Sequence, residues 1–141
     1  MVWIPPKSPF NLIQESLWEN PWQLLVACIF CNQTKRVCAE PILWDFFEKY
    51  PTPECAASAD IDELIEMLSP LGLQKRRAYT LIRFSREFVE KEWKLPRDLY
   101  GIGKYGTDAW QIFCQGSWQE VSPSDHALND YHRFLEERSH A

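Results

Sequence analysis

The sequence predicts an all-α fold, arranged as a single compact helical domain. Apolar residues recur at helical spacing through most of the chain, and no stretch has the alternation of a half-buried strand. Helix start signals and short loops follow one another without a repeat or a low-complexity segment. With 141 residues, 45% of them hydrophobic, the chain can bury roughly two-thirds of its unfolded surface, so we expect one domain over residues 1–141.

The first part of the chain is expected to hold two helices. Residues 1–9 are rich in proline and predict an irregular lead-in to a first helix at about residues 11–19. Asn20 and Pro21 then supply an N-cap and a first helical residue for a second helix. Residues 24–31 of that helix are apolar on every side, which predicts a position in the middle of the domain.

The middle of the chain predicts one interrupted helix and two short ones. Thr34 is expected to cap a helix that reaches Tyr50 and is broken or kinked at Pro41. Short helices are expected to begin at residues 52–54 and to span residues 60–68.

The longest helix is expected over about residues 74–93. The residues expected on its buried face are Ala78, Leu81, Ile82, Ser85, Phe88 and Val89. The arginines that fall off this face are Arg76, Arg83 and Arg86. After a loop and a short turn at residues 98–100, further helices are expected at residues 104–114 and 123–137.

The charge distribution is compatible with a basic face on an acidic body. The net charge of −5 is unusual for a DNA-binding protein, because affinity for a duplex comes largely from Lys and Arg. The basic residues gather at Lys35-Arg36, Lys75-Arg76-Arg77, Arg83, Arg86 and Lys104, and the acids at residues 45–66 and 136–137. The same pattern also fits solvated helix faces.

The cysteines predict an intracellular protein without a metal. Five cysteines is an odd number and no apolar signal segment stands at the N-terminus, which favours a reducing compartment. No run of about 18 apolar residues predicts a membrane span. Cys28 and Cys31 lie in the apolar helix, where cysteine behaves as a small hydrophobe, and the other cysteines follow no zinc pattern. We therefore expect no metal in catalysis and no cofactor.

A glycine-rich stretch begins at Leu99. An apolar residue followed by Gly101-Ile102-Gly103 and a helical pattern predicts a tight hairpin that opens a helix, with unpaired N–H groups that can bind an anion. Both glycines are expected to turn with positive φ and to leave room for a phosphate. Gly101, Ile102, Gly103 and Lys104 are therefore the candidate phosphate-binding residues.

The hairpin, followed by a helix and then Asp125, resembles the helix-hairpin-helix DNA glycosylase superfamily. The stretches that carry the resemblance are Ser8–Glu15, Pro70–Leu73, Gly101–Gly106 and Pro123–His126. They are similar to the thymine and uracil glycosylase domains of the methyl-CpG-binding domain protein four family. The similarity runs over nearly the whole chain and implies an enzyme of base excision repair, with its active site in a cleft next to the hairpin.

Asp125 has two compatible interpretations. Ser122 and Pro123 fit an N-cap and a first helical residue, which would make Asp125 the acid of a capping box. The resemblance instead implies that Asp125 is the catalytic residue, which assists cleavage as positive charge builds on the sugar. Whether it attacks C1′, activates water or only stabilises the cation is left open. His126, beside it, is expected to be a phosphate or structural contact.

Tyr105 indicates the type of reaction. In the members that also cut the strand, its position holds a Lys that forms a Schiff base with the sugar. Lys104 is one residue away, about 100° around a helix, so it is not expected to be the nucleophile. The resemblance implies an enzyme without lyase activity, in which Tyr105 lines the base pocket; the alternative is an aromatic residue packed in the core.

Three further residues take expected roles from the resemblance. Gln14 matches a Gln that hydrogen-bonds the flipped pyrimidine, for which a side-chain amide offers both a donor and an acceptor. Leu73 matches the apolar wedge that fills the gap in the base stack, and Gln33 matches a gap-filling Arg. Gln14 as an exposed helix residue and Leu73 as a core residue remain alternatives.

Two departures from the family pattern predict weaker and less salt-dependent DNA binding. Gln33 keeps the reach of the Arg but loses its charge, and Ala127 stands where a Lys is expected. The reaction type is expected to be unchanged.

The sequence thus predicts a monofunctional glycosylase that removes thymine or uracil mispaired with guanine in double-stranded DNA and leaves an abasic site. The alternative is a non-catalytic helix-hairpin-helix module that binds duplex DNA, and a purine-excising enzyme is a third possibility. The resemblance implies a nuclear protein, and we expect a monomer whose partner is DNA and not a membrane.

Overall fold

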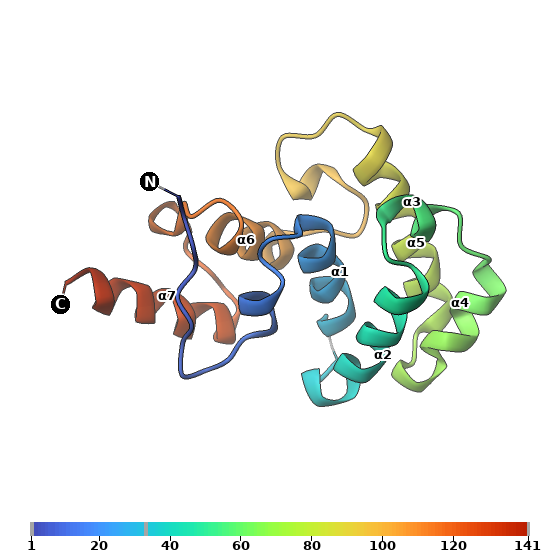
Figure 1. Cartoon of the computed structure of the whole chain (residues 1–141), viewed down its shortest axis with the longest axis horizontal. Coiled ribbons are helices and arrows are strands. Elements are labelled where there is room, and N and C mark those ends of the chain that lie inside the picture. Colours follow the sequence, from blue (N-terminus) through green and yellow to red (C-terminus); the bar gives the residue numbers. More distant parts are fainter. Residues whose placement is uncertain (1, 33, 141) are drawn as a thin grey trace.

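The structure is a computed structural model that describes residues 2–32 and 34–140, and every regular element in these residues is a helix (Figure 1). The predicted all-α fold is confirmed. Within the same residues, no helix combines the length and the apolar character that crossing a bilayer requires.

The first helix is shorter than expected. Only a 3-10 turn, η1 (Ile13–Ser16), forms where the sequence predicts a helix over residues 11–19. Asn11 has a φ of 50°, which interrupts a helix, and the Glu15 carboxylate accepts hydrogen bonds of 2.9 Å from the N–H groups of Ser8 and Leu12. The lead-in is thereby folded back onto this turn.

Helix α1 (Pro21–Cys31) lies in the centre of the molecule, as its apolar sequence predicts. The Asn20 side chain caps it by accepting the N–H of Gln23 at 3.1 Å. Helix α1 packs against α2 (Arg36–Lys49), α5 (Gln74–Glu90) and α6 (Lys104–Phe113), and Figure 1 shows it between the two halves of the fold.

Helix α2 differs from the prediction at its start. Its N-cap is Lys35, which makes no side-chain capping bond, and Thr34 instead accepts a hydrogen bond from Arg77. Pro41 lies inside a continuous helix, because the buried Ala39 and Leu43 hold the chain against the core on both sides of it.

Helices α3 (Pro53–Ala57) and α4 (Ile61–Leu68) begin where their capping signals predict. Thr52 and Asp60 accept hydrogen bonds from the backbone of the first turns of these helices. The turn η2 (Ser69–Leu71) connects α4 to α5, and both α3 and α4 pack against α5.

The buried face of α5 is partly different from the expected one. The helix ends at Glu90, and Val89 is exposed, so the prediction for Val89 is wrong. Trp93 lies beyond the helix and packs on Phe88 and Trp110, with ring centroids 5.4 and 6.0 Å apart. Arg77, which the pattern does not place on the buried face, is only 8% exposed.

The last part of the chain forms the other half of the fold. The turn η3 (Pro96–Asp98) precedes the glycine hairpin, and α6, the turn η4 (Trp118–Glu120) and α7 (His126–Ser139) follow it. Trp3 donates its indole N–H to the Phe113 carbonyl at 3.0 Å, and the Tyr131 hydroxyl donates to the Pro6 carbonyl at 2.7 Å. The N-terminal lead-in therefore lies along α6 and α7 (Figure 1).

Candidate active site

The glycine hairpin over residues 99–103 is fixed against α5. Gly101 has a φ of 83°, and a Cβ there would lie 2.5 Å from Cγ2 of Thr80, so this position requires glycine for both reasons. Gly103 has a φ of −113°, which any residue can adopt, so the expected positive φ is wrong there. A Cβ at Gly103 would meet no atom within 4 Å, which leaves the approach to the N-terminus of α6 open.

Tyr100 also anchors the hairpin to α5. Its N–H donates to the Glu87 carboxylate at 3.0 Å, and the Arg83 guanidinium lies over its ring, 4.1 Å from the centroid. Arg83 is also paired with Glu87 at 3.0 Å. Arg83 therefore holds the hairpin onto α5, in addition to contributing positive charge.

Lys104 joins the start of α6 to the loop that precedes α7. Its ammonium donates to the Asp108 carboxylate at 2.6 Å and to the Ser122 carbonyl at 2.7 Å. The charge expected to meet a phosphate is thus already paired with Asp108 in the same helix.

Asp125 is the N-cap of α7 and not the third residue of a capping box at Ser122. The helix begins at His126, and one Asp125 carboxylate oxygen accepts the N–H of Leu128 at 3.0 Å. The side chain is half-buried, and no described residue donates to its other oxygen. A carboxylate in this position is anchored at one oxygen and can present the second to a ligand.

Gln14 and Tyr105 form a pair at the centre of the site. The Gln14 amide donates to the Tyr105 hydroxyl at 2.9 Å and to the Cys28 sulfur at 3.7 Å. Gln14 is buried, so the alternative of an exposed helix residue is wrong. Burial raises the pKa of Tyr105 above its usual value, and the nearby thiols of Cys28 and Cys31 and the carboxylate of Asp125 act in the same direction.

The thiols of the site are held in the uncharged form. Burial raises the pKa of Cys28 to about 12, partly offset by its hydrogen bond with Gln14. Cys31 has a raised pKa for the same chief reason. A nucleophilic or metal-binding cysteine needs the thiolate, which these surroundings disfavour.

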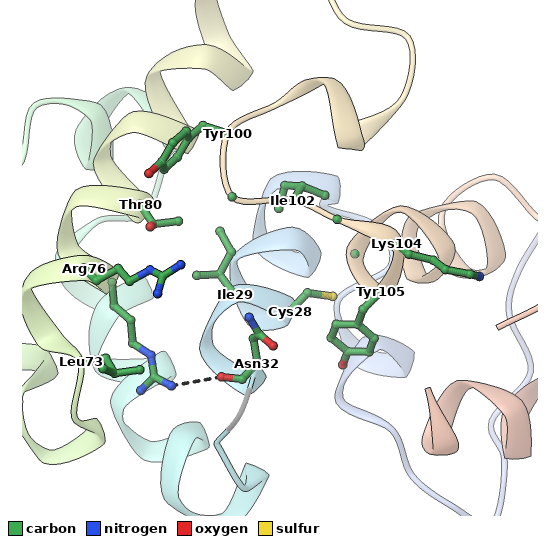
Figure 2. Close-up of a pocket in the computed structure, with 14 residues that line it drawn as sticks. Cys28, Ile29, Asn32, Leu73, Arg76, Thr80, Tyr100, Ile102, Lys104 and Tyr105 are labelled. Atoms are coloured by element: carbon green, nitrogen blue, oxygen red, sulfur yellow. Dashed lines mark hydrogen bonds between the residues drawn. The ribbon is translucent and has the colours of Figure 1, made fainter. Parts of the chain in front are cut away.

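A cavity of about 530 Å³ lies between the hairpin, the end of α1 and the start of α5 (Figure 2). Tyr105 and Cys28 line one part of it, and Leu73 and Arg76 another. Gln14 and Asp125 do not line this cavity. Figure 2 also shows the Lys104 and Tyr105 side chains leaving α6 in different directions, as their spacing on a helix predicts.

Leu73 lies at the edge of this cavity, on the surface. It is 57% exposed, so the alternative of a core residue is wrong, and its backbone has the left-handed values φ 50° and ψ 33°. The preceding Gly72 has a φ of 76°, so two successive residues make this turn. Gln33, the other candidate gap-filling residue, lies outside the described residues.

The residues next to the Asp125 cap point toward solvent. The His126 side chain is 95% exposed, 3.5 Å from the Asp130 carboxylate, and Ala127 is exposed. His126 is accessible to a phosphate, and Ala127 adds no charge.

The sequence pattern did not indicate Arg77 as a functional candidate. Its guanidinium is buried and donates to backbone carbonyls next to Leu73 and at the end of α1. Arg77 has helical spacing with the buried Leu81 and Phe84, so an arginine in an apolar stripe was the available signal.

Known proteins resemble this chain over most of its length. The family model described as HhH-GPD superfamily base excision DNA repair protein matches residues 26–134. A methyl-CpG-binding domain protein 4-like protein of Arabidopsis thaliana is 39% identical over 134 residues, which is 95% of this chain and 30% of that protein. A thymine-DNA glycosylase of Aeropyrum pernix is 31% identical over 62% of this chain and 44% of its own length. The chain therefore spans less than half of these relatives.

Solved structures agree in fold. A thermostable thymine-DNA glycosylase superposes with a TM-score of 0.64 at 20% identity, over 92% of this chain and 70% of the other. The protein in a non-covalent endonuclease III–DNA complex superposes with a TM-score of 0.60 at 24% identity, over 67% of this chain and 48% of the other. Since the family model covers the hairpin, α6 and the Asp125 cap within one matched region, the chain belongs to the HhH-GPD superfamily of base excision DNA repair proteins.

Proposed function

We propose that the chain is a monofunctional DNA glycosylase that removes thymine or uracil mispaired with guanine in double-stranded DNA. The observation that carries the proposal is the pairing of Gln14 with Tyr105, next to the charge of Asp125. The relatives named thymine-DNA glycosylase support the choice of a pyrimidine. Cleavage of a base from its sugar takes place outside the helical stack, and flipping is easiest for a mispaired base.

Gln14 gives the site its preference for a pyrimidine edge. An amide offers both a donor and an acceptor, which suits the O2, N3–H and O4 groups of thymine or uracil. Because Gln14 is 2% exposed and donates to Tyr105, a base reaches it only when the Tyr105 side chain moves aside or shares the bond. Tyr105 therefore lines the proposed pocket and also controls whether a base can reach Gln14.

Asp125 assists the cleavage step. The bond between C1′ and the base nitrogen breaks with its electron pair leaving on the base, and water adds to C1′ while its proton ends on the departing base. Positive charge builds on the sugar as the bond lengthens, and an ionised carboxylate at that place stabilises it. As the N-cap of α7, Asp125 lies at the positive end of that helix's dipole.

The residues at the start of α6 support the proposed absence of strand cleavage. A Schiff base with the sugar needs an amine, and Tyr105 has none at the position where strand-cutting members carry Lys. The neighbouring Lys104 amine is engaged with Asp108 and Ser122. The product of the proposed reaction is an abasic site.

The hairpin is proposed to hold the DNA backbone. The N–H groups at the start of α6 have no acceptor one turn earlier in the helix, and the open space at Gly103 allows a phosphate to approach them. His126 would add a contact at the start of α7, and Leu73 would enter the gap in the stack. Action as a monomer and a nuclear location belong to the same proposal.

A second function has its own support. Asp125 caps α7 and Gln14 is covered by Tyr105, and neither contact requires chemistry, so both would also suit a hairpin module that only binds duplex DNA. Incubation with duplexes that carry one G·T, G·U or 8-oxoguanine pair, followed by hot alkali, separates the functions. The enzyme gives a nick at G·T and G·U, whereas the binding module gives none, and a nick only at 8-oxoguanine would indicate a different substrate.

A further inference from the structure

Arg77 occupies an unusual place for a charged residue. It lies in the first turn of α5, on the face that carries Ala78 and Leu81 into the core, and it is only 8% exposed. No described carboxylate pairs with it. Burial lowers the pKa of its guanidinium from the usual value, which is the expected effect of desolvation. Placing a cation there is costly unless its donors are used.

The guanidinium uses its donors on two separate loops. Nη1 donates to the carbonyls of Leu71 and Gly72 at 3.0 and 3.2 Å. Nη2 donates to the Asn32 carbonyl at 3.1 Å and to the Thr34 hydroxyl. Figure 2 draws the bond to Asn32 as a dashed line. Arg77 therefore joins the turn over residues 71–73, which we name the wedge loop, to the connection between α1 and α2.

The wedge loop needs such a restraint. Leu73 combines a left-handed backbone, which is unfavourable for a leucine, with a side chain that is 57% exposed to water. A conformation of this kind persists only where the surroundings fix it. The carbonyls of Leu71 and Gly72, immediately before Leu73, are the atoms that Arg77 binds.

We propose that Arg77 is a positioning residue that fixes the wedge loop, so that Leu73 enters the gap of the base stack at a set depth and direction. The planar fork of arginine reaches two loops at once, which the single ammonium of a lysine does not. This inference rests on the proposed function, because it assigns Leu73 its task there.

The test is a double-mutant cycle of Arg77→Lys and Leu73→Ala, with Arg86→Lys as the matched control on the exposed face of α5. We expect Arg77→Lys to slow single-turnover excision at a G·T pair by roughly 10- to 100-fold, as misplacement of a group by about 1 Å does. In the Leu73→Ala background the same change should add less than about 2-fold, because nothing remains to be positioned. The proposal would be overturned if Arg77→Lys slowed excision by the same factor in the parent and in Leu73→Ala, or if Arg77→Lys left the rate normal.

A second readout does not depend on excision. A 2-aminopurine beside the mismatch brightens when the stack opens and the wedge enters, whether or not the base is cleaved. We expect this signal with the parent protein and with Arg86→Lys, and its loss with Arg77→Lys. A parent that gives the signal but no abasic product would contradict the proposed function and leave the positioning role supported, whereas a parent without the signal would overturn the role.

A milder variant tests the same contacts with less risk of unfolding the protein. Thr34→Val removes one acceptor of Arg77 and keeps the shape of the side chain. It should reduce the 2-aminopurine signal less than Arg77→Lys does, with an unchanged circular dichroism spectrum. An unaffected signal would show that the bond between Arg77 and the Thr34 hydroxyl has no part in positioning Leu73.

Discussion

The Gln14 amide and the Tyr105 hydroxyl, 91 positions apart in the sequence, lie 2.9 Å from each other. This bond joins the turn after the N-terminal lead-in to the helix that follows the glycine hairpin. Because Gln14 is almost fully buried beneath it, the bond closes the place where the proposed pocket would open. The same hydrogen bond therefore stabilises the fold and covers the proposed entry of a base.

Removing the Tyr105 hydroxyl should lower stability. Tyr105→Phe leaves a buried amide hydrogen of Gln14 without its oxygen acceptor, which costs about 1–3 kcal/mol. Urea denaturation should show this decrease in the free energy of unfolding. Tyr79→Phe, which removes an exposed hydroxyl, should change it by less than about 0.5 kcal/mol. Equal stabilities of the two variants would contradict this account of the pair.

Borohydride should trap no covalent complex with the parent protein. The Lys104 amine is held by Asp108 and Ser122, and Tyr105 has no amine, so no Schiff base with the sugar is expected. The measurement is gel electrophoresis of the protein with a G·U duplex and borohydride. Tyr105→Lys serves as the positive control, since it supplies an amine at the required position. A trapped adduct that Lys104→Ala abolishes would refute the monofunctional assignment.

A lysine at position 127 should strengthen DNA binding. Ala127 is exposed in the first turn of α7 and contributes no charge to a phosphate contact. One added phosphate contact increases the slope of log affinity against log salt concentration by roughly 0.9. Fluorescence anisotropy at several salt concentrations measures this slope for Ala127→Lys, and Ala127→Gln is the uncharged control. Identical slopes for both variants would place position 127 away from the DNA.

Stability should begin to fall near pH 9.0, below the pH at which tyrosine in the unfolded chain ionises. Burial raises the pKa of Cys28 and of Cys114 from 9.0 to about 12, so each thiol keeps its proton in the folded state after the unfolded chain has lost it. Stability from these groups is fully present below about pH 9 and is lost as the pH rises toward 12, at up to about 1.4 kcal/mol per pH unit for each group. Tyrosine in the unfolded chain ionises only near pH 10.

The measurement is the free energy of unfolding of the parent and of Cys28→Ala between pH 8 and about 10. The variant should be less stable at pH 8, because a buried side chain is lost, and should decline less steeply above about pH 9. Cys38→Ala, at an exposed position, should follow the parent. Parallel curves for the parent and Cys28→Ala would show that the thiol of Cys28 is not protected by burial.

The local signals in the sequence predicted most of the fold. Asn20, Thr52 and Asp60 cap helices where their side chains indicate, because a cap depends only on the next few residues. The helix at residues 11–19 was wrong, since Glu15 binds Ser8 and Leu12 in a way that no periodicity reveals. The predicted start of the last helix at residue 123 was also wrong, because Asp125 and not Ser122 is its N-cap.

The candidate site was predictable only in part. The family resemblance led us to propose Gln14, Tyr105 and Asp125 as site residues, and the structure places a hydrogen bond between the first two. The burial of Arg77 and the left-handed backbone of Leu73 result from contacts between distant segments, which local spacing does not encode. Gly103 also departs from the prediction, because its backbone is extended, with a φ of −113°, where a positive φ was expected.

The most direct test compares two substitutions of Asp125 in excision from a G·T duplex. Asn keeps an oxygen that can cap α7, whereas Ala removes the cap at a cost of about 0.5–2 kcal/mol in stability. If the negative charge assists cleavage, both variants lose excision by about 100-fold or more, although Asp125→Asn unfolds at nearly the parent temperature. Excision by Asp125→Asn at the rate of the parent would contradict the catalytic role of Asp125 and leave a carboxylate that only caps a helix.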